Sequence, residues 1–342
     1  MSGFTVGLAI LGGLILAALV AYNAWTTRRN TPKQPDFVVT KTSEAGETVR
    51  AEPTFDPVVT MGPIPVPERK PGLDALIDVL APIVIDSVVT GEAAQAALPP
   101  TRRAGSKPFA IEGRNETTGE WETPRAGQRY NAFQAGVQLA NRNGALNEIE
   151  YSEFVVKAQA FADAVNGAPE FPEMLDEVAR ARELDQFASA HDAQLGFTLR
   201  ARAAAWSPGY LQQHAAKLGF VAGALPGRMV LPAASNGGSP ILGLSFSTQA
   251  ALADDLSQSA IREVTLSLDV PQVPRSEQPF MRMRDAAIAL AASMEGLITD
   301  DNGTVLANDA LDFIGADLED LYDTLDARDL SAGSPQARRL FS

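Results

Sequence analysis

The chain has 342 residues, a formal net charge of −14 and a pI near 4.7. Its length predicts two domains plus an appendage, and 45% hydrophobic residues are enough for a sizeable core. The acidic balance argues against a nucleic-acid partner, because binding to a phosphate backbone depends on Lys and Arg. The absence of cysteine excludes disulfides, thiol nucleophiles and Cys-type zinc sites, and it is compatible with a reducing compartment.

The first predicted element is an N-terminal membrane anchor. Met1–Thr27 carries no charged side chain, and a helix over Phe4–Tyr22 would span about 28 Å, enough to cross a bilayer. The alternative is a cleaved signal peptide, which normally begins with Lys or Arg and ends in a small-residue cleavage site. Because no charge precedes the apolar run, we predict an uncleaved transmembrane anchor over residues 1–29, in contact with inner-membrane lipid through Phe4–Tyr22.

The residues after the anchor predict its orientation and a linker. Arg28, Arg29 and Lys33 follow the apolar run, and such charges stay on the cytoplasmic side. We therefore expect a single-pass protein of the cell inner membrane, with a periplasmic N-terminus and a cytoplasmic C-terminal part. Residues 30–72 hold eight prolines and few apolar residues, which predicts a flexible linker. Fully extended, it would reach on the order of 130 Å at about 3.1 Å per residue and hold a domain clear of the lipid.

Residues 73–190 read as an α+β domain. A strand broken by Pro82 is followed by a short helix at 91–98, and Ser152 is expected to cap a helix with an apolar face that includes Phe154 and Phe161. A second helix is predicted over 172–188. Further strands are predicted at 109–112, 121–123 and 133–139.

Residues 191–342 begin with strand and helix patterns at 194–199, 210–218, 228–231 and 240–246. Val264–Val270 then alternates apolar and polar residues, which is typical of a strand with one buried face. Pro279 sits at the first turn of a helix whose apolar residues recur at steps of three and four up to Met294. Asp300–Gly303 lies between two apolar segments and predicts a tight hairpin. A last, acidic helix is predicted over 309–328.

The segments Val264–Pro271, Met281–Met294 and Gly296–Asp301 resemble the C-terminal domain of the bacterial cell-division protein ZipA. The resemblance reaches back to about Asp192. It implies an antiparallel sheet covered on one face by helices, a split β-α-β arrangement of the ZipA C-terminal type. It also implies that the partner is the C-terminal peptide of FtsZ and that the protein acts at the division site.

The order of strand, helix, two or more strands, helix and helix occurs twice, and Gly167 follows its helix as Gly296 follows the later one. We therefore interpret residues 73–190 as a degenerate copy of 191–330. The alternatives are an unrelated α+β domain and an extension of one sheet.

Catalytic motifs give no support to an enzyme. The sequence has no phosphate-binding Gly-rich loop, no Gly-x-Ser-x-Gly elbow and no His-Glu-x-x-His pair. His191-Asp192 lacks the companion histidines of a metal site, His214 reads as a helix residue, and Asp300–Gly303 lacks the first carboxylate of a calcium loop. We expect no catalysis, no cofactor, no metal and no small-molecule substrate.

The resemblance implies that the open face of the second sheet binds the peptide. Leu225, Met229 and Ile241 are candidate apolar contacts, and Thr198, Arg200 and Arg228 are a candidate polar rim. Each residue has an alternative role in the core or on a plain surface. Alternation places Thr265, Ser267 and Asp269 outward on the best-defined strand, and this polar set differs from the apolar patch that the family uses. A second reading therefore stays open: a membrane-anchored scaffold for another division or envelope protein, with FtsZ binding lost or weakened.

Overall fold

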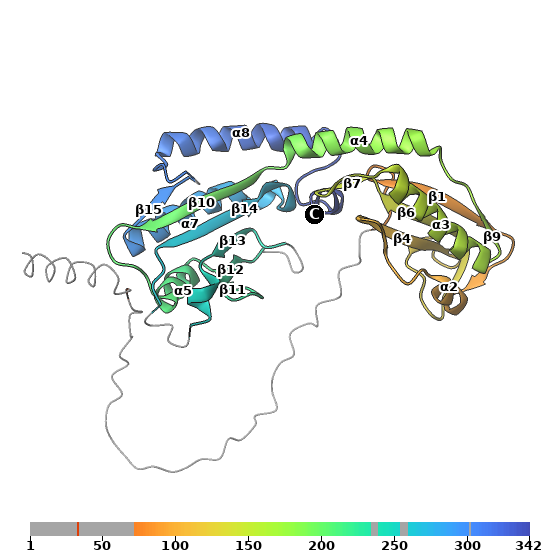
Figure 1. Ribbon diagram of the computed structural model, residues 1–342, viewed down its shortest axis with the longest axis horizontal. Helices are drawn as coiled ribbons and strands as arrows, with labels where there is room; N and C mark the ends of the chain where they lie inside the picture. The colour runs from red at the N-terminus through yellow and green to blue at the C-terminus, as the bar shows by residue number, and fades with distance from the viewer. Residues whose placement is uncertain (1–32, 34–71, 234–238, 254–258, 301) are drawn as a thin grey trace, which may run out of the picture. The chain divides into compact units, whose positions relative to one another are not determined.

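A computed structural model describes residue 33 and residues 72–233, 239–253, 259–300 and 302–342 (Figure 1). These residues form two compact units, each built on an antiparallel sheet with helices. Unit 1 contains Lys33, Leu195–Leu268 and Glu277–Gly315, and unit 2 contains residues 72–194, Asp269–Ser276 and Ala316–Ser342. The predicted α+β class is confirmed.

The units are discontinuous in sequence, which differs from the predicted domains 73–190 and 191–342. The first boundary lies after Gln194, close to the expected place, but Asp269–Ser276 and Ala316–Ser342 belong to unit 2. The physical reason is apolar burial, since Val270, Val273, Leu340 and Phe341 are each at most 1% exposed. Helix α8 (Asn308–Asp326) therefore contributes residues to both units.

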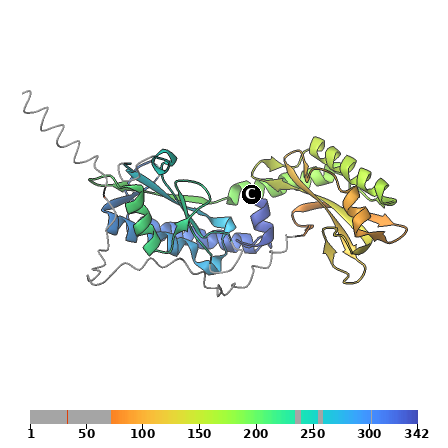
Figure 2. The same cartoon turned by 90° about the horizontal axis from the view of Figure 1, so that it is seen from below.

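The sheet of unit 2 has the order β3-β4-β6-β1-β9, with β2 paired to β6 and β5 paired to β4. Its helix α3 (Glu148–Ala164) lies along one face (Figures 1 and 2), where Phe161 packs against Phe133 of β6 at 5.1 Å between ring centroids. The remaining bounds are β1 (Asp78–Ile85), β2 (Val89–Thr90), α2 (Gly91–Ala97), β3 (Arg103–Ala104), β4 (Lys107–Asn115), β5 (Trp121–Glu122), β6 (Arg129–Gln138), β7 (Ala140–Asn141), β8 (Gly144–Ala145), β9 (Gly167–Pro169), α4 (Met174–His191), η1 (Val270–Gln272), η2 (Arg275–Glu277) and α9 (Pro335–Leu340).

Two local predictions in unit 2 were wrong. Strand β1 continues through Pro82, because the extended backbone accepts the φ of proline, and Ala81 and Ile83 on either side keep their pairing with β6. Helix α3 starts earlier than Ser152. Asn147 caps it, accepting from the backbone N–H of Glu150, whose carboxylate accepts from the N–H of Asn147 in return. This reciprocal pair satisfies two free backbone donors, which explains why the helix begins there.

The sheet of unit 1 has the order β11-β12-β13-β14-β10-β15. Helix α7 (Pro279–Met294) begins at the predicted proline and packs on the sheet, where Phe280 meets Phe197 of β10 at 6.4 Å between ring centroids. Buried Trp206 donates its indole N–H to the Met294 carbonyl at 2.8 Å. The remaining bounds are β10 (Gln194–Ala201), α5 (Pro208–Lys217), β11 (Val221–Ala222), β12 (Arg228–Leu231), β13 (Leu242–Ser245), α6 (Thr248–Ala251), β14 (Glu263–Asp269) and β15 (Gly296–Thr299).

Lys33 is paired with unit 1 through its backbone. Its N–H donates to the Ala205 carbonyl at 2.7 Å, and its carbonyl accepts from the Ser207 N–H at 3.0 Å, so it forms a parallel bridge to Trp206. Its ammonium lies 3.0 Å from a carboxylate oxygen of Glu295. The chain is therefore fastened to unit 1 at residue 33.

The predicted turn after β15 is present. The Gly303 N–H donates to the Asp300 carbonyl at 3.0 Å, Gly303 has φ of +82°, and Thr299 forms a bridge with Val305. A φ in this region favours glycine, because a Cβ would clash with the backbone. The second arm of the hairpin is this single bridge rather than a full strand.

The two units share one strand order. In unit 2 the central strands run β4-β6-β1-β9, and in unit 1 they run β13-β14-β10-β15. In each unit the first strand of the chain lies between the third and the fourth, and a helix connects those last two strands. This is the split β-α-β arrangement.

Candidate peptide-binding face

The burial pattern of strand β14 shows which face of the unit 1 sheet is turned to the core. Val264, Leu266 and Leu268 are at most 1% exposed and belong to the core under α7. Alternation along a strand then turns Thr265 and Ser267 to the opposite face, which we call the open face. Ser267 is exposed and Thr265 is half-buried.

The strand registers bring five of the predicted residues onto this open face. Arg228 pairs with Ser245, and Ser245 pairs with Thr265. Direct partners in an antiparallel pair project to the same side. On β10, the guanidinium of Arg200 lies 3.1 Å from the carboxylate of Glu263 at the start of β14, and Thr198 lies two residues before it on the same side. The five residues are Thr198, Arg200, Arg228, Thr265 and Ser267.

Two predicted contacts belong to the core instead, and this corrects the sequence analysis. Met229 is 5% exposed and Ile241 is 1% exposed. Met229 pairs with Leu244, which pairs with Leu266, so Met229 shares the buried side of the sheet with the apolar residues of β14. An apolar pattern over the four residues of β12 does not reveal which side faces the core.

Leu225 lies at the edge of the sheet. It sits between β11 and β12, its carbonyl accepts from the Arg228 N–H at 3.2 Å, and its side chain is 60% exposed. Val221, which is 49% exposed, pairs with Val230 on the open face. The apolar residues of the open face are thus Val221 and Val230, and Leu225 is exposed in the turn next to them. Of these three residues, the sequence analysis found only Leu225.

A glycine lies beside this apolar part of the open face. Gly243 pairs with both Val230 and Ser267, and its carbonyl accepts from the Ser267 hydroxyl at 3.4 Å. A Cβ at position 243 would lie only 2.6 Å from that hydroxyl oxygen. The Ser267 side chain therefore occupies the space above this glycine. Beside it lie the half-buried Val230, the exposed Val221 and the exposed side chain of Arg228. This combination suits a short peptide with apolar residues and a carboxylate.

Asp269 does not complete the polar set on β14. Its carboxylate accepts two hydrogen bonds from Arg142, each at 2.8 Å, and Arg142 also holds Asp192 at 2.6 and 2.8 Å. These three residues belong to unit 2. The pKa of Arg142 rises further above its ordinary value, first because Asp192 and then because Asp269 binds the guanidinium. Asp269 is engaged in a structural ion pair, so the polarity of the open face rests on Thr265 and Ser267.

The histidines take local contacts. His191 lies with Nδ1 2.7 Å from the Phe187 carbonyl, and His214 is buried against the Tyr210 ring. Within the described ranges, no group of three or more His, Cys, Asp or Glu side chains is arranged to hold a metal ion. Within those ranges there is also no helix with the length and apolar content to cross a membrane, and the predicted span Phe4–Tyr22 lies outside them.

Comparison with known families identifies one segment of the chain. Residues 250–316 match the family model described as ZipA, C-terminal FtsZ-binding domain, which confirms the predicted resemblance to ZipA. The match contains β14, α7 and β15, and therefore Thr265 and Ser267, whereas Thr198, Arg200, Leu225 and Arg228 lie before it. A search of curated proteins finds no match to the chain.

Proposed function

We propose that this chain, through its ZipA-type FtsZ-binding segment, holds FtsZ at the cytoplasmic membrane during division by binding the C-terminal tail of FtsZ. The observation that carries the proposal is the family match over residues 250–316, on a sheet whose open face carries exposed apolar residues beside Arg228. A short peptide that folds against such a face is a common recognition mode. The valine pair and Leu225 take its apolar residues, and Arg228 takes a carboxylate.

The membrane is the second half of the proposal. The uncharged run Phe4–Tyr22, followed by Arg28 and Arg29, supports a single-pass inner-membrane anchor with a cytoplasmic C-terminal part. The mechanism is a raised local concentration of FtsZ at the membrane. A lipid anchor and a peptide-binding site on one chain hold a polymer near the bilayer even when each contact is weak. No catalytic step is involved.

We also propose that unit 2 is a degenerate copy of unit 1. Both units have the same strand order. In both, a residue with φ near +50°, Asn166 or Glu295, lies between the helix and the glycine that starts the fourth strand. These glycines pair with the last residue of the first strand, Ile85 in unit 2 and Ala201 in unit 1. An experimental structure in which any equivalent strand runs in the opposite direction would refute the duplication.

The binding test uses the full chain in lipid nanodiscs, titrated with a fluorescent peptide of the FtsZ C-terminus from the same cell. We expect saturable binding that Leu225→Asp and Val221→Asp each weaken about tenfold or more, equivalent to about 1.4 kcal/mol. Met281→Asp is the matched control, because Met281 is an exposed apolar residue of unit 1 that lies on α7. Met229 is unsuitable as a probe because its substitution would disrupt the core.

The alternative function is a scaffold for another division or envelope protein. Thr265 and Ser267 favour this alternative over FtsZ binding, because they make the centre of the open face polar. Absence of peptide binding to a folded chain would refute the FtsZ reading and leave this one.

The anchor is tested separately: because the chain has no cysteine, Ser2→Cys and Ser342→Cys can each be labelled in cells with an impermeant thiol reagent. We expect periplasmic labelling at position 2 alone, and labelling at position 342 would refute the proposed orientation.

A further inference from the structure

The unit 2 sheet presents apolar side chains on the side away from α3, which we call the unit 2 face. Val79, Ala81 and Ile83 of β1 belong to the core under α3. Alternation along the strand therefore turns Pro82 and Val84 to the unit 2 face. Val84 is 58% exposed and Pro82 is exposed as well. These two apolar residues of a central strand thus meet solvent.

The neighbouring strands add small apolar residues to the unit 2 face. Direct partners in an antiparallel pair project to the same side, and Val84 pairs with the exposed Ala168 of β9. On the other side of β1, the strands contribute the half-buried Ala132 of β6 and the exposed Ala110 of β4. Apolar residues of the unit 2 face therefore occur on four neighbouring strands, β4, β6, β1 and β9.

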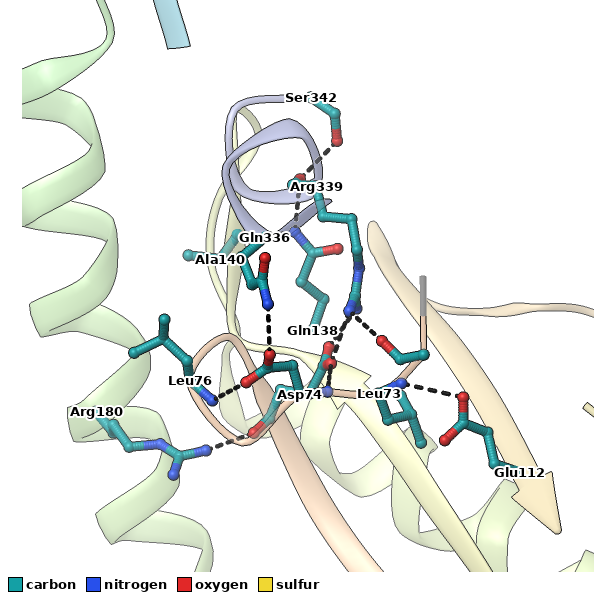
Figure 3. A network of polar contacts seen from close by, with 12 residues as sticks. Leu73, Asp74, Leu76, Glu112, Gln138, Ala140, Arg180, Gln336, Arg339 and Ser342 are labelled. Carbon is teal, nitrogen blue, oxygen red and sulfur yellow. Dashed lines mark hydrogen bonds and ion pairs between the residues drawn. The ribbon is translucent and has the colours of Figure 1, made fainter. Parts of the chain in front are cut away.

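One residue from outside the sheet already lies on the unit 2 face. A Cβ at Gly136 would lie 2.5 Å from Cδ2 of Leu73, so the leucine side chain occupies the space above this glycine. The Leu73 N–H donates to the Glu112 carboxylate at 3.1 Å (Figure 3), and the other carboxylate oxygen accepts from Gln134 at 2.9 Å. The unit 2 face therefore accepts an apolar side chain together with a backbone donor, which are the two contacts that a peptide offers.

Arg114 gives the unit 2 face a positive charge. It is exposed and pairs with Ala132, which precedes the partner of Ile83, so it lies in the cross-strand row of Val84, about 10 Å away. Within the described residues, its guanidinium forms no ion pair and no hydrogen bond. A carboxylate of a partner suits this position. The chain's own residues before Gly72 include Arg69 and Lys70, whose charges oppose binding beside Arg114.

The unit 2 face has the same place in its sheet as the open face of unit 1. Val84 and Arg200 each precede the last residue of the first strand, which pairs with the glycine that starts the fourth strand. They are equivalent positions, apolar in unit 2 and charged in unit 1. Each face nevertheless combines an exposed valine with an exposed arginine, Val84 with Arg114 and Val221 with Arg228.

We propose that the unit 2 face is a second binding site for the FtsZ tail, taken as a short peptide with apolar residues and a carboxylate. The inference rests on the proposed function, which supplies this peptide. Val84 and Pro82 contact its apolar residues, and Arg114 binds its carboxylate. One chain then carries two peptide sites, which strengthens its attachment to a polymer that presents many tails.

The test reads the unit 2 face directly, in the full chain in nanodiscs. Because the chain has no cysteine, Ala168→Cys can carry an environment-sensitive fluorophore beside Val84. Titration with the FtsZ tail peptide should give a saturable change in its emission. Val156→Cys is the control label, since Val156 is 68% exposed on α3, and it should give no change. An unresponsive label at position 168 would overturn the proposal, as would a label that is shielded from a soluble quencher before any peptide is added.

Two variants of the chain labelled at position 168 test the carboxylate contact and separate the two sites. Arg114→Gln should raise the peptide concentration at half-maximal response about tenfold or more. Arg102→Gln is the matched control, because Arg102 is an exposed cation of unit 2 whose two neighbours in sequence both contact Lys157 of α3. Equal responses of these two variants would overturn the proposal.

Leu225→Asp, which weakens the site in unit 1, should leave the response at position 168 unchanged. Peptide binding that Leu225→Asp weakens, without any response at position 168, would refute the second site and leave the proposed function intact. A response at position 168 that Leu225→Asp abolishes would also overturn the second site, because the label would then report binding to unit 1.

Discussion

Arg142 determines how Asp269→Asn changes the free energy of unfolding. We expect this substitution to destabilise the parent chain and to stabilise the Arg142→Met variant. Its guanidinium binds Asp192 and Asp269 through four hydrogen bonds of 2.6 to 2.8 Å. The side chains of the three residues are 29%, 23% and 34% exposed. One nitrogen, Nη2, binds an oxygen from each carboxylate, so those two oxygens lie no more than about 5 Å apart. Arg142→Met removes the cation and leaves two carboxylates facing each other.

The magnitude follows from these distances. Each bidentate pair is partly screened by solvent and contributes about 1 kcal/mol, at the upper end for exposed pairs. Two like charges about 5 Å apart repel by about 0.8 kcal/mol in water and about 3.3 kcal/mol at an effective dielectric constant of 20. Arg142→Met should therefore lower the free energy of unfolding by about 3 to 5 kcal/mol. Asp269→Asn should lower it by about 1 kcal/mol in the parent, and raise it by about 1 to 3 kcal/mol in the Arg142→Met background.

Urea unfolding of the parent, both single variants and the double variant measures these four free energies, provided that the two units are followed by separate probes. Arg129→Met is the control, because its pair with Glu116 is 64% and 42% exposed and should contribute less than about 0.5 kcal/mol. If Asp269→Asn is destabilising in both backgrounds, the carboxylates do not repel across an empty guanidinium site and the reasoning fails. A loss below about 1 kcal/mol in Arg142→Met would refute it as well.

Three further outcomes are expected. Burial raises the pKa of Tyr322 to about 12, above its unfolded value of about 10; between these pH values only the unfolded state loses the proton, so stability falls as pH rises. This loss is at most about 2.7 kcal/mol before solvent screening, and Tyr322→Phe should remove it. Urea midpoints of the parent and the variant at pH 8 and 12 measure the loss. If the difference between pH 8 and 12 is the same in both proteins, the prediction is wrong. Gln278, at φ of +49° without a side-chain cap bond, should gain about 0.5 to 1 kcal/mol on Gln278→Gly, and a lower thermal midpoint would argue against backbone strain there. Gly91→Ala should cost more than about 2 kcal/mol, since its Cβ would lie 1.7 Å from the Arg125 carbonyl oxygen; a variant as stable as the parent in urea would refute this.

Elements with long, regular patterns were predictable from sequence. Strand β14 and helix α7 lie within one residue of their expected starts, because alternation in the strand and the first-turn proline in the helix are local signals. The Asn147–Glu150 capping pair is also a local signal, since it is a three-residue spacing at a helix start, whereas Ser152, the predicted cap, lies inside the helix. Local chemistry was therefore sufficient for most elements of both units.

Contacts between distant segments were not predictable. Met229 was assigned to the open face because the four residues of β12 do not define their inward side, which only the pairing with Leu244 reveals. Helix α9 has six residues, too few for a periodic pattern, and its arginine meets a carboxylate from the first strand of unit 2. Alternation predicts that Asp269 points outward with Thr265 and Ser267, but its cation comes from Arg142, 127 positions away. Single-sequence patterns contain no information about such pairs.

The pairing of Lys33 with Trp206 determines which part of the chain sets the working distance from the bilayer. With the proposed anchor ending at residue 29, only four peptide steps separate it from the point where unit 1 is fastened, a reach of about 13 Å at most. Residues 34–71 then connect unit 1 to unit 2 and add nothing to that distance. A polymer bound to unit 1 would therefore be held close to the lipid surface. The extended linker predicted over residues 30–72 would instead have held it far from the lipid.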